Sequence, residues 1–232
     1  MIRQIPLDLR WPSHQRLDAF WPGANVHALQ SVSGAAKGEG AWLYLHGASG
    51  TGKSHLLIGA CRAVLEADRP ARYVSLAELA APRSDAMAGI EPAGLFAIDD
   101  VQAVAGDDGA ERALFDLYNR AKTAGACMLF AGNASPAELG IRLPDLVSRL
   151  SMCAQCALRP LDDSGRRAML RVLAGRLGLR LDDEVLDWWF ARQPRDPASL
   201  VALLQRIDRA ALAAQRRVTI PFLRELLQAR DA

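Results

Sequence analysis

Residues 47–54 read Gly-Ala-Ser-Gly-Thr-Gly-Lys-Ser and match the pattern G-x-x-x-x-G-K-[ST] at every fixed position. An apolar run at 41–46 precedes this motif, and a segment with helical periodicity follows it at 54–65. Between a strand and a helix, such a loop directs its backbone N–H groups at phosphate oxygens near the helix N-terminus. The sequence therefore predicts a binding site for a nucleoside di- or triphosphate.

The spacing of the motif assigns a task to each part of the loop. Its glycines allow the backbone to bend, Lys53 reaches the β- and γ-phosphates, and the hydroxyl of Ser54 is a magnesium ligand. The expected nucleotide-binding residues are Gly47, Ala48, Ser49, Gly50, Thr51, Gly52, Lys53, Ser54 and His55. The expected cofactors are the nucleotide and Mg²⁺.

Short apolar runs and helical segments alternate along the first two thirds of the chain. The runs after the first lie at 71–76, 94–100, 126–132 and 154–158, and a clear helical pattern covers 109–123. This alternation predicts a parallel sheet covered by helices on both faces, an α/β fold. Beyond Pro160 only helical patterns remain, at 163–178, 182–193, 197–214 and 220–229. We therefore expect an α/β nucleotide-binding domain over 13–160 and a small all-α domain over 161–232.

Two carboxylates end the third apolar run, Leu-Phe-Ala-Ile-Asp99-Asp100. Beside a phosphate loop, Asp99 can hold magnesium through water and Asp100 can polarise an attacking water. The alternative is that both carboxylates only face solvent at the end of a strand and have no role in catalysis.

Two further polar residues are candidates for catalytic groups. Asn133 follows the fourth run, where it either orients a water beside the γ-phosphate or forms an Asx turn before Pro136. Arg149 lies just before the last run, where it is either an arginine finger for a neighbouring subunit's phosphates or a surface residue of a helix.

The net charge and the cysteines argue against a tight nucleic-acid binder and against a secreted protein. The net charge is +2, too small to predict tight binding to nucleic acid through phosphate neutralisation. The four cysteines do not form a secretory disulfide framework, and no signal peptide or membrane-spanning run is recognisable. We therefore expect a cytoplasmic protein with no membrane partner.

The motifs together resemble a known family. GASGTGKSHLL, FAIDDVQ, FDLYNR, the strand end at Asn133 and LPDLVSRL occur in the order found in the AAA+ module of the bacterial replication initiator DnaA. The resemblance extends from Phe20 to Leu227. It implies an AAA+ P-loop NTPase module followed by a small helical lid, with ADP or ATP as the nucleotide. It also implies that Asp99 is the Walker B magnesium ligand, Asn133 is sensor 1 and Arg149 is the arginine finger.

The ends of the matched region, FWPGAN and QRRVTIPFLREL, resemble a regulatory branch of this family that inactivates DnaA. DnaA itself has a helix-turn-helix domain and a helical insertion that grips single-stranded DNA. We expect neither device here, because only residues 77–93 separate the second and third runs and the sequence ends at Ala232.

The first twelve residues contain a second motif. Gln4-Ile-Pro-Leu-Asp-Leu9 resembles the Q-x-x-L-x-L peptide that docks on the DNA polymerase sliding clamp, its β subunit, through Gln4, Ile5, Leu7 and Leu9. The alternative is an alternating stretch that packs on its own domain. With the family resemblance, it predicts a clamp-tethered inhibitor of replication initiation that stimulates hydrolysis of ATP bound to DnaA. This protein would be nucleoid-associated through the clamp, would reach DNA only indirectly, and would form a homo-oligomer.

The chain departs from the family pattern at two positions. Ala198 aligns where many relatives have a lid arginine that contacts the phosphates, and Arg195 in the preceding loop is the candidate replacement. The second Walker B acid is Asp100 rather than Glu, and its shorter side chain predicts slow intrinsic hydrolysis. Nucleotide would then serve mainly as a ligand for folding and assembly.

Two other functions are compatible with the phosphate loop. A DNA-acting AAA+ ATPase, such as a helicase loader, is disfavoured by the short interval at 77–93 and by the small net charge. A small-molecule P-loop kinase does not account for Asp100, Asn133 and Arg149 in this order.

Overall fold

The computed structural model describes residues 11–12, 14–80, 83–92 and 94–228. Contacts between residues divide the chain into two compact units, Met1–Arg159 and Pro160–Ala232. The first unit is an α/β domain and the second is helical.

The first unit contains five parallel strands in the order β2-β3-β4-β1-β5. Their bounds are β1 (Leu43–His46), β2 (Ala71–Ser75), β3 (Leu95–Asp99), β4 (Cys127–Gly132) and β5 (Ala154–Ala157). Every apolar run identified in the sequence is a strand, shortened at its ends by one or two residues. The predicted parallel sheet is therefore confirmed.

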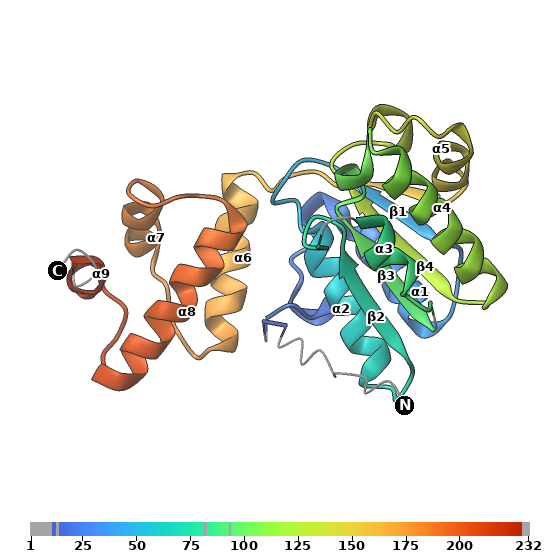
Figure 1. The fold of residues 1–232 in the computed structure, drawn as a ribbon. Coiled ribbons are helices and arrows are strands. Elements are labelled where there is room, and N and C mark those ends of the chain that lie inside the picture. Colours follow the sequence, from blue (N-terminus) through green and yellow to red (C-terminus); the bar gives the residue numbers. More distant parts are fainter. Residues whose placement is uncertain (1–10, 13, 81–82, 93, 229–232) are drawn as a thin grey trace. The chain divides into compact units, whose positions relative to one another are not determined.

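Helices cover both faces of this sheet (Figure 1). They are α1 (Val26–Lys37), α2 (Lys53–Leu65), α3 (Arg83–Ala88), α4 (Asp108–Thr123) and α5 (Pro144–Ser151). Four 3₁₀ turns accompany them: η1 (Leu17–Ala19), η2 (Gly23–Asn25), η3 (Val101–Val104) and η4 (Pro136–Glu138). The helices expected at 54–65 and 109–123 are confirmed, whereas the sequence patterns assigned no helix to the position of α1.

Alternate residues of the strands point into two separate hydrophobic cores, as the period of two in a β-strand requires. One core lies under α3, α4 and α5, and the other lies under α1 and α2. The strand residues of the first core include Tyr44, Phe96 and Phe130, and those of the second include Leu45, Ala97 and Leu129.

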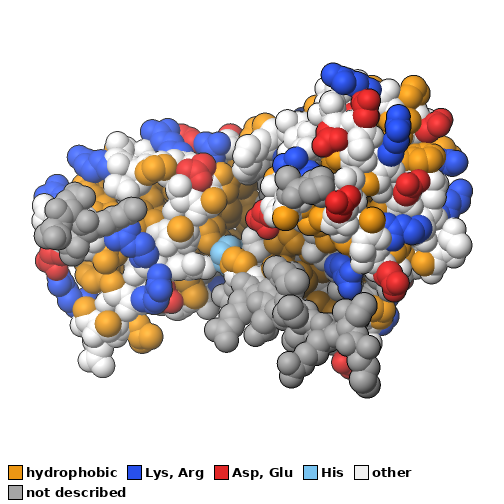
Figure 2. All heavy atoms as spheres, viewed as in Figure 1, with side chains coloured by type: hydrophobic (Ala, Val, Ile, Leu, Met, Phe, Trp, Pro, Cys, Tyr) orange, Lys and Arg blue, Asp and Glu red, His pale blue; other side chains and the backbone are white. Residues whose placement is uncertain are grey.

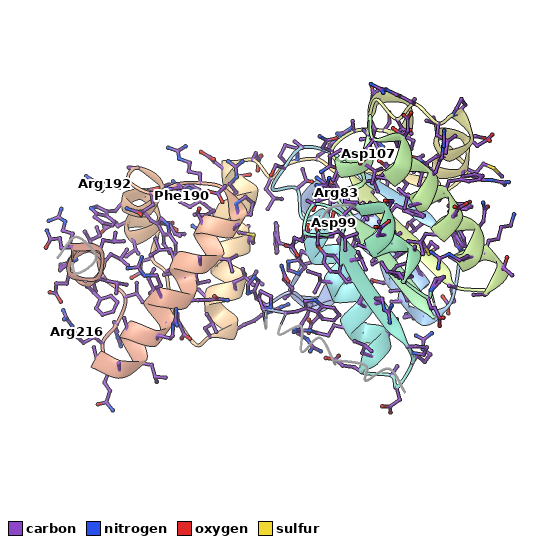
Figure 3. The ribbon with its side chains drawn as sticks, viewed as in Figure 1. Arg83, Asp99, Asp107, Phe190, Arg192 and Arg216 are labelled. Atoms are coloured by element: carbon purple, nitrogen blue, oxygen red, sulfur yellow. The ribbon has the colours of Figure 1, made fainter. Side chains whose placement is uncertain are left out.

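Local capping fixes where the helices of this unit begin and end. The carboxylate of Asp107 accepts hydrogen bonds from the N–H groups of Gly109 and Ala110 at the start of α4 (labelled in Figure 3). Helix α1 ends at Gly38, whose φ of +89° lies in the left-handed region that favours glycine.

The second unit consists of α6 (Asp163–Arg176), α7 (Asp183–Phe190), α8 (Pro197–Ala214) and α9 (Ile220–Gln228). Asp162 caps α6 through the N–H of Gly165 at 2.7 Å, and Asp196 caps α8 through that of Ser199 at 2.9 Å. The buried side chain of Trp189 lies in its core, and the Arg167 guanidinium lies 4.6 Å from the ring centroid of Phe190. The expectation of an all-α unit after the sheet is confirmed.

Charged side chains of both signs are interspersed on the visible face of each unit (Figure 2). None of the helices in the described part of the chain is sufficiently long and apolar to cross a lipid bilayer.

Phe130 tests the first hydrophobic core. Its side chain is fully buried in β4 and stacks on Tyr118 with ring centroids 6.1 Å apart. Phe130→Ala should lower the free energy of unfolding by about 3–5 kcal/mol, because it removes buried apolar contacts and leaves a cavity. Phe130→Leu, which preserves more of the volume, should cost only about 1–1.5 kcal/mol. Urea denaturation followed by circular dichroism measures both, and an alanine variant as stable as the leucine variant would contradict this assignment.

Candidate nucleotide-binding site

The loop between β1 and α2 is shaped by glycines that no other residue could replace without displacement. Gly47 has a φ of +146°, and a Cβ there would lie 2.4 Å from the carbonyl oxygen of Leu158. Gly52 has a φ of +95°, and a Cβ there would lie 2.6 Å from the ring of Phe20. The backbone can therefore turn into the N-terminus of α2 only where these side chains are absent.

Lys53 lies across this loop as the first residue of α2. Its ammonium donates hydrogen bonds to the carbonyl oxygens of Gly47 at 2.7 Å and Ala48 at 2.9 Å. Partial burial lowers the pKa of Lys53, while the nearby charges of Asp99 and Asp100 oppose that shift. The ammonium is thus held over the loop, on the side where the two carboxylates lie.

Asp99 ends β3 and is almost completely buried, at 1% exposed (Figure 3). It accepts hydrogen bonds from the Tyr73 hydroxyl at 2.9 Å, from the backbone N–H of Asp100 at 2.8 Å, and from Ser54. Burial raises the pKa of Asp99 above its usual range, although these hydrogen bonds counteract the shift. Burial and the same carboxylate raise the pKa of Tyr73, which therefore remains a hydrogen-bond donor.

This arrangement fits a magnesium ion, because a hydroxyl and a carboxylate oxygen meet beside the phosphate loop. Oxygen ligands of this type, completed by water and phosphate, are those that Mg²⁺ prefers. Ser54 and Asp99, the two predicted metal residues, are therefore brought together by the fold. In the residues that the structure describes, no group of three or more His, Cys, Asp or Glu side chains is arranged to hold a metal ion.

Asp100 adopts a left-handed backbone conformation with a φ of +57°, which is uncommon for a residue with a side chain. Its two carboxylate oxygens accept hydrogen bonds from the Ser75 hydroxyl at 2.8 Å and from the Gln102 amide at 3.0 Å. Asp100 is thus anchored on both oxygens, which fixes its orientation and limits its freedom to act on a water.

Gln102 is a site residue that the sequence interpretation quoted within a motif but assigned no role. While its amide nitrogen binds Asp100, its Oε1 accepts a hydrogen bond from the backbone N–H of Asn133 at 3.2 Å. Gln102 therefore bridges the end of β3 to the end of β4. The structure places Asn133 at the predicted strand end, with its side chain exposed.

The segment before α1 packs against the start of α2. The ring of Phe20 meets that of His55 edge-on at 5.4 Å, and His55 Nε2 forms a hydrogen bond of 2.8 Å with the carbonyl of Arg16. Burial lowers the pKa of His55, which favours the neutral imidazole. His55 therefore lies in the first turn of α2, where it supports the segment that approaches the loop.

Asn25 is buried and forms two hydrogen bonds of 2.8 Å with the backbone N–H and carbonyl of Arg159. This paired contact fastens the same N-terminal segment to the chain just after β5. Phe20 thus lies against the loop at Gly52, and Asn25 holds the same segment to the chain after β5.

Arg149 lies away from this loop. It belongs to α5, whose buried residues Leu146 and Leu150 join the core under α3 and α4, whereas α2 packs on the opposite face of the sheet (Figure 1). Its guanidinium forms no hydrogen bond or ion pair with another residue of the described ranges. The structure therefore does not bring Arg149 together with the phosphate loop of its own chain.

The two lid positions differ in their surroundings. Ala198 is exposed near the start of α8, and Arg195 donates hydrogen bonds to the Phe190 carbonyl at 2.9 Å and to Asp163 at 2.6 Å. Arg195 thus connects elements of the lid.

The predicted clamp-binding residues Gln4, Ile5, Leu7 and Leu9 lie outside the described residues.

Comparison with known proteins places this arrangement in a family. A family model of the bacterial DnaA ATPase domain matches residues 15–157, and a model described as the Hda lid domain matches residues 163–227.

Solved structures have the same fold. Domain III of the replication initiation protein DnaA from Thermotoga maritima is 22% identical, with a TM-score of 0.71, covering 94% of this chain and 97% of that chain. AMPPCP-bound DnaA from Aquifex aeolicus is also 22% identical, with a TM-score of 0.70, covering 84% of this chain and 65% of that one. The RuvB Holliday junction branch migration motor from Thermotoga maritima is 16% identical, with a TM-score of 0.64, covering 93% of this chain and 72% of that one.

The chain thus spans less than two thirds of the Aquifex aeolicus DnaA that it matches. The ATPase-domain match alone covers more than half of this chain, and the lid match covers most of the remainder. The chain therefore belongs to the DnaA family of AAA+ proteins, with a lid of the Hda type.

Proposed function

We propose that this chain is a regulator of replication initiation that binds adenine nucleotide with Mg²⁺ and stimulates hydrolysis of ATP bound to DnaA. The observation that carries the proposal is the position of Arg149. Its helix α5 packs on the face of the sheet opposite α2, and its guanidinium has no ionic partner among the described residues. An arginine in this position is suited to the phosphates of another molecule.

The nucleotide part of the proposal rests on the glycine loop, Lys53, and the Ser54–Asp99 pair. Lys53 and the N-terminus of α2 supply positive charge for the phosphates, and Ser54 and Asp99 supply oxygen ligands for the metal. Bound magnesium would neutralise phosphate charge at this position. A family member with AMPPCP bound, the DnaA of Aquifex aeolicus, supports adenine as the base.

Weak intrinsic hydrolysis is part of the same proposal. Both oxygens of Asp100 already accept hydrogen bonds, from Ser75 and Gln102, and the residue has the shorter of the two acidic side chains. Its carboxylate is therefore poorly placed to polarise a water. We infer that nucleotide acts here mainly as a ligand for folding and assembly, including assembly with DnaA and with further copies of this chain.

Tethering to the sliding clamp through Gln4, Ile5, Leu7 and Leu9 completes the proposal. It is supported by the sequence pattern alone, because these residues lie outside the described ranges. A clamp on DNA would concentrate the protein near replicated DNA, so that DNA is reached indirectly and the protein is nucleoid-associated in the cytoplasm.

Lys53→Ala tests the phosphate site. Loss of a charged hydrogen-bond donor to phosphate should weaken ADP and ATP binding by about 10- to 100-fold. Isothermal titration calorimetry with magnesium present measures the dissociation constants. Lys37→Ala, at the exposed end of α1, is the matched control and should bind as the wild type does. Equal affinity in both variants would reject the assignment of Lys53.

Asp99→Asn tests the metal ligand. Chelation of magnesium should weaken nucleotide binding by the wild type but not by this variant, because the variant has lost its anionic ligand. The folded-state pKa of Asp99 is raised, so its ionised form opposes folding at neutral pH, and this cost is relieved as the pH falls through that pKa. Without metal, the neutral amide should therefore leave the melting temperature at pH 7 unchanged or higher. Asp116→Asn, on the exposed side of α4, is the control. An Asp99→Asn variant that retains full magnesium dependence would exclude this role.

Arg149→Ala and deletion of residues 1–9 separate catalysis from tethering. The rate of hydrolysis of ATP bound to DnaA is measured with DNA-loaded clamp present. Arg149→Ala should reduce stimulation to the background rate while clamp binding persists, because an arginine finger contributes about 10³-fold or more. The deletion should abolish clamp binding and the clamp-dependent part of the stimulation.

Arg72→Ala, on the exposed edge strand β2, is the matched control for loss of an arginine. Full stimulation by Arg149→Ala would refute the finger. Absence of stimulation by the folded wild type, together with salt-sensitive binding to single-stranded DNA, would favour a DNA-acting ATPase such as a helicase loader.

A further inference from the structure

A buried carboxylate outside the nucleotide site connects three segments of the first unit. Glu111, in the first turn of α4, is 1% exposed. Its Oε1 accepts a hydrogen bond from the N–H of Gly106 at 2.8 Å, and its Oε2 accepts one from that of Leu143 at 2.8 Å. The N–H of Arg142 lies between the two oxygens, at 3.1 and 3.0 Å.

Such a group is stable in the interior only because all of its acceptors are used. Burial of an ionised carboxylate is strongly unfavourable unless hydrogen bonds replace its hydration. Three backbone N–H groups converge on Glu111, and bonds from amides to a charged acceptor are shorter and stronger than neutral ones. A glutamine there would turn an NH₂ group toward N–H donors, so at least one bond would be lost without loss of side-chain volume.

The backbone partners of Glu111 belong to two segments, one that follows the nucleotide site and one that precedes the helix carrying Arg149. Gly106 closely follows η3, the turn that begins directly after Asp100 and contains Gln102. Arg142 and Leu143 precede Pro144, the first residue of α5, and Leu143 is its N-cap. Arg149 is six residues beyond Leu143, which is fewer than two helical turns.

We propose that Glu111 is a positioning residue that sets the start of α5, and with it Arg149, relative to the turn after Asp100. This inference rests on the proposed function of Arg149. Glu111 touches neither nucleotide nor the reacting atoms, and acts only through the backbone of the segments that it joins.

The packing of α5 explains why loss of the Glu111 bonds would shift the first turn of this helix without detaching the helix from the domain. Leu146 and Leu150 are fully buried in the core, so α5 stays on the domain when its entry segment is released. Leu143 contributes no side-chain cap hydrogen bond to the helix, and the bond from its N–H to Glu111 adds to the packing of its side chain against the core at the first turn. Freedom at this turn becomes displacement of the Arg149 guanidinium, and small misplacements of a catalytic group are costly.

Glu111→Gln in the full chain tests the proposal, with Asp108→Asn as the matched control. Asp108 is an exposed acid on the same helix, and its carboxylate lies 3.8 Å from the guanidinium of Arg142. Hydrogen exchange should become at least about 10-fold faster in Glu111→Gln for peptides covering 104–107 and 140–151. Exchange in the sheet should remain as in the wild type, because only local bonds are lost.

The functional test compares the binding of ADP and clamp with the maximal stimulation of ATP hydrolysis on DnaA. Glu111→Gln should bind ADP and clamp within about twofold of the wild type, while the maximal stimulation of ATP hydrolysis on DnaA falls about 10-fold or more. Asp108→Asn should match the wild type in every measurement. A purely structural role predicts instead faster exchange throughout the sheet and weaker ADP binding, and that result would overturn the proposal.

Unchanged exchange at 140–151 would also overturn it, whatever the rate. If Glu111→Gln does not fold, Glu111→Asp replaces it, since it keeps the charge but shortens the side chain, and the same criteria apply. If the folded wild type fails to stimulate DnaA, the proposed function has failed, and the exchange measurement alone decides whether Glu111 holds α5.

Discussion

The register of the parallel sheet is the constraint on which the nucleotide site depends. Ser75 pairs with Asp99 across β2 and β3, and His46 pairs with both Gly132 and Ala157 across β4, β1 and β5. In a parallel sheet these strand ends lie along one edge, which brings the phosphate loop and the residues that follow β3 and β4 to the same place. A shift of one residue in any pairing would send these side chains to the other face of the sheet.

Polar contacts then fix this edge from strand to strand. Ser75 holds Asp100, Gln102 connects Asp100 to the backbone of Asn133, and Tyr73 holds Asp99. Because these bonds cross from β2 through β3 to β4, the end of one strand cannot move without breaking contacts with its neighbours. The fold itself therefore orients the carboxylates at this edge of the sheet.

The sequence predicts those parts of the molecule that depend on local patterns. The five strands follow from short apolar runs, and the phosphate loop and Asp99 follow from fixed spacing. Helix α1 is missed because Ser31, Ser33 and Gly34 weaken its helical signal. Gln102 and Glu111 are missed because each makes its decisive contacts 31 or 32 residues away. In the sequence, Glu111 resembles the exposed acids around it, and only the fold reveals three N–H donors directed at it.

The separation of α2 and α5 onto opposite faces gives these long-range contacts their significance. Helix α5 packs on the face opposite α2, and in the proposed function its Arg149 acts on the phosphates of another molecule. Its usefulness there depends on how firmly its helix is held, since an arginine on a mobile helix would lose much of its orientation on binding. Two residues near η3 hold the segments around it. Gln102 orients the residues after β3 and β4, and Glu111 binds the backbone at the start of α5. Hydrogen bonds on the two sides of η3 thus reach both the nucleotide site and the start of α5, the helix that acts on a neighbour in the proposed function.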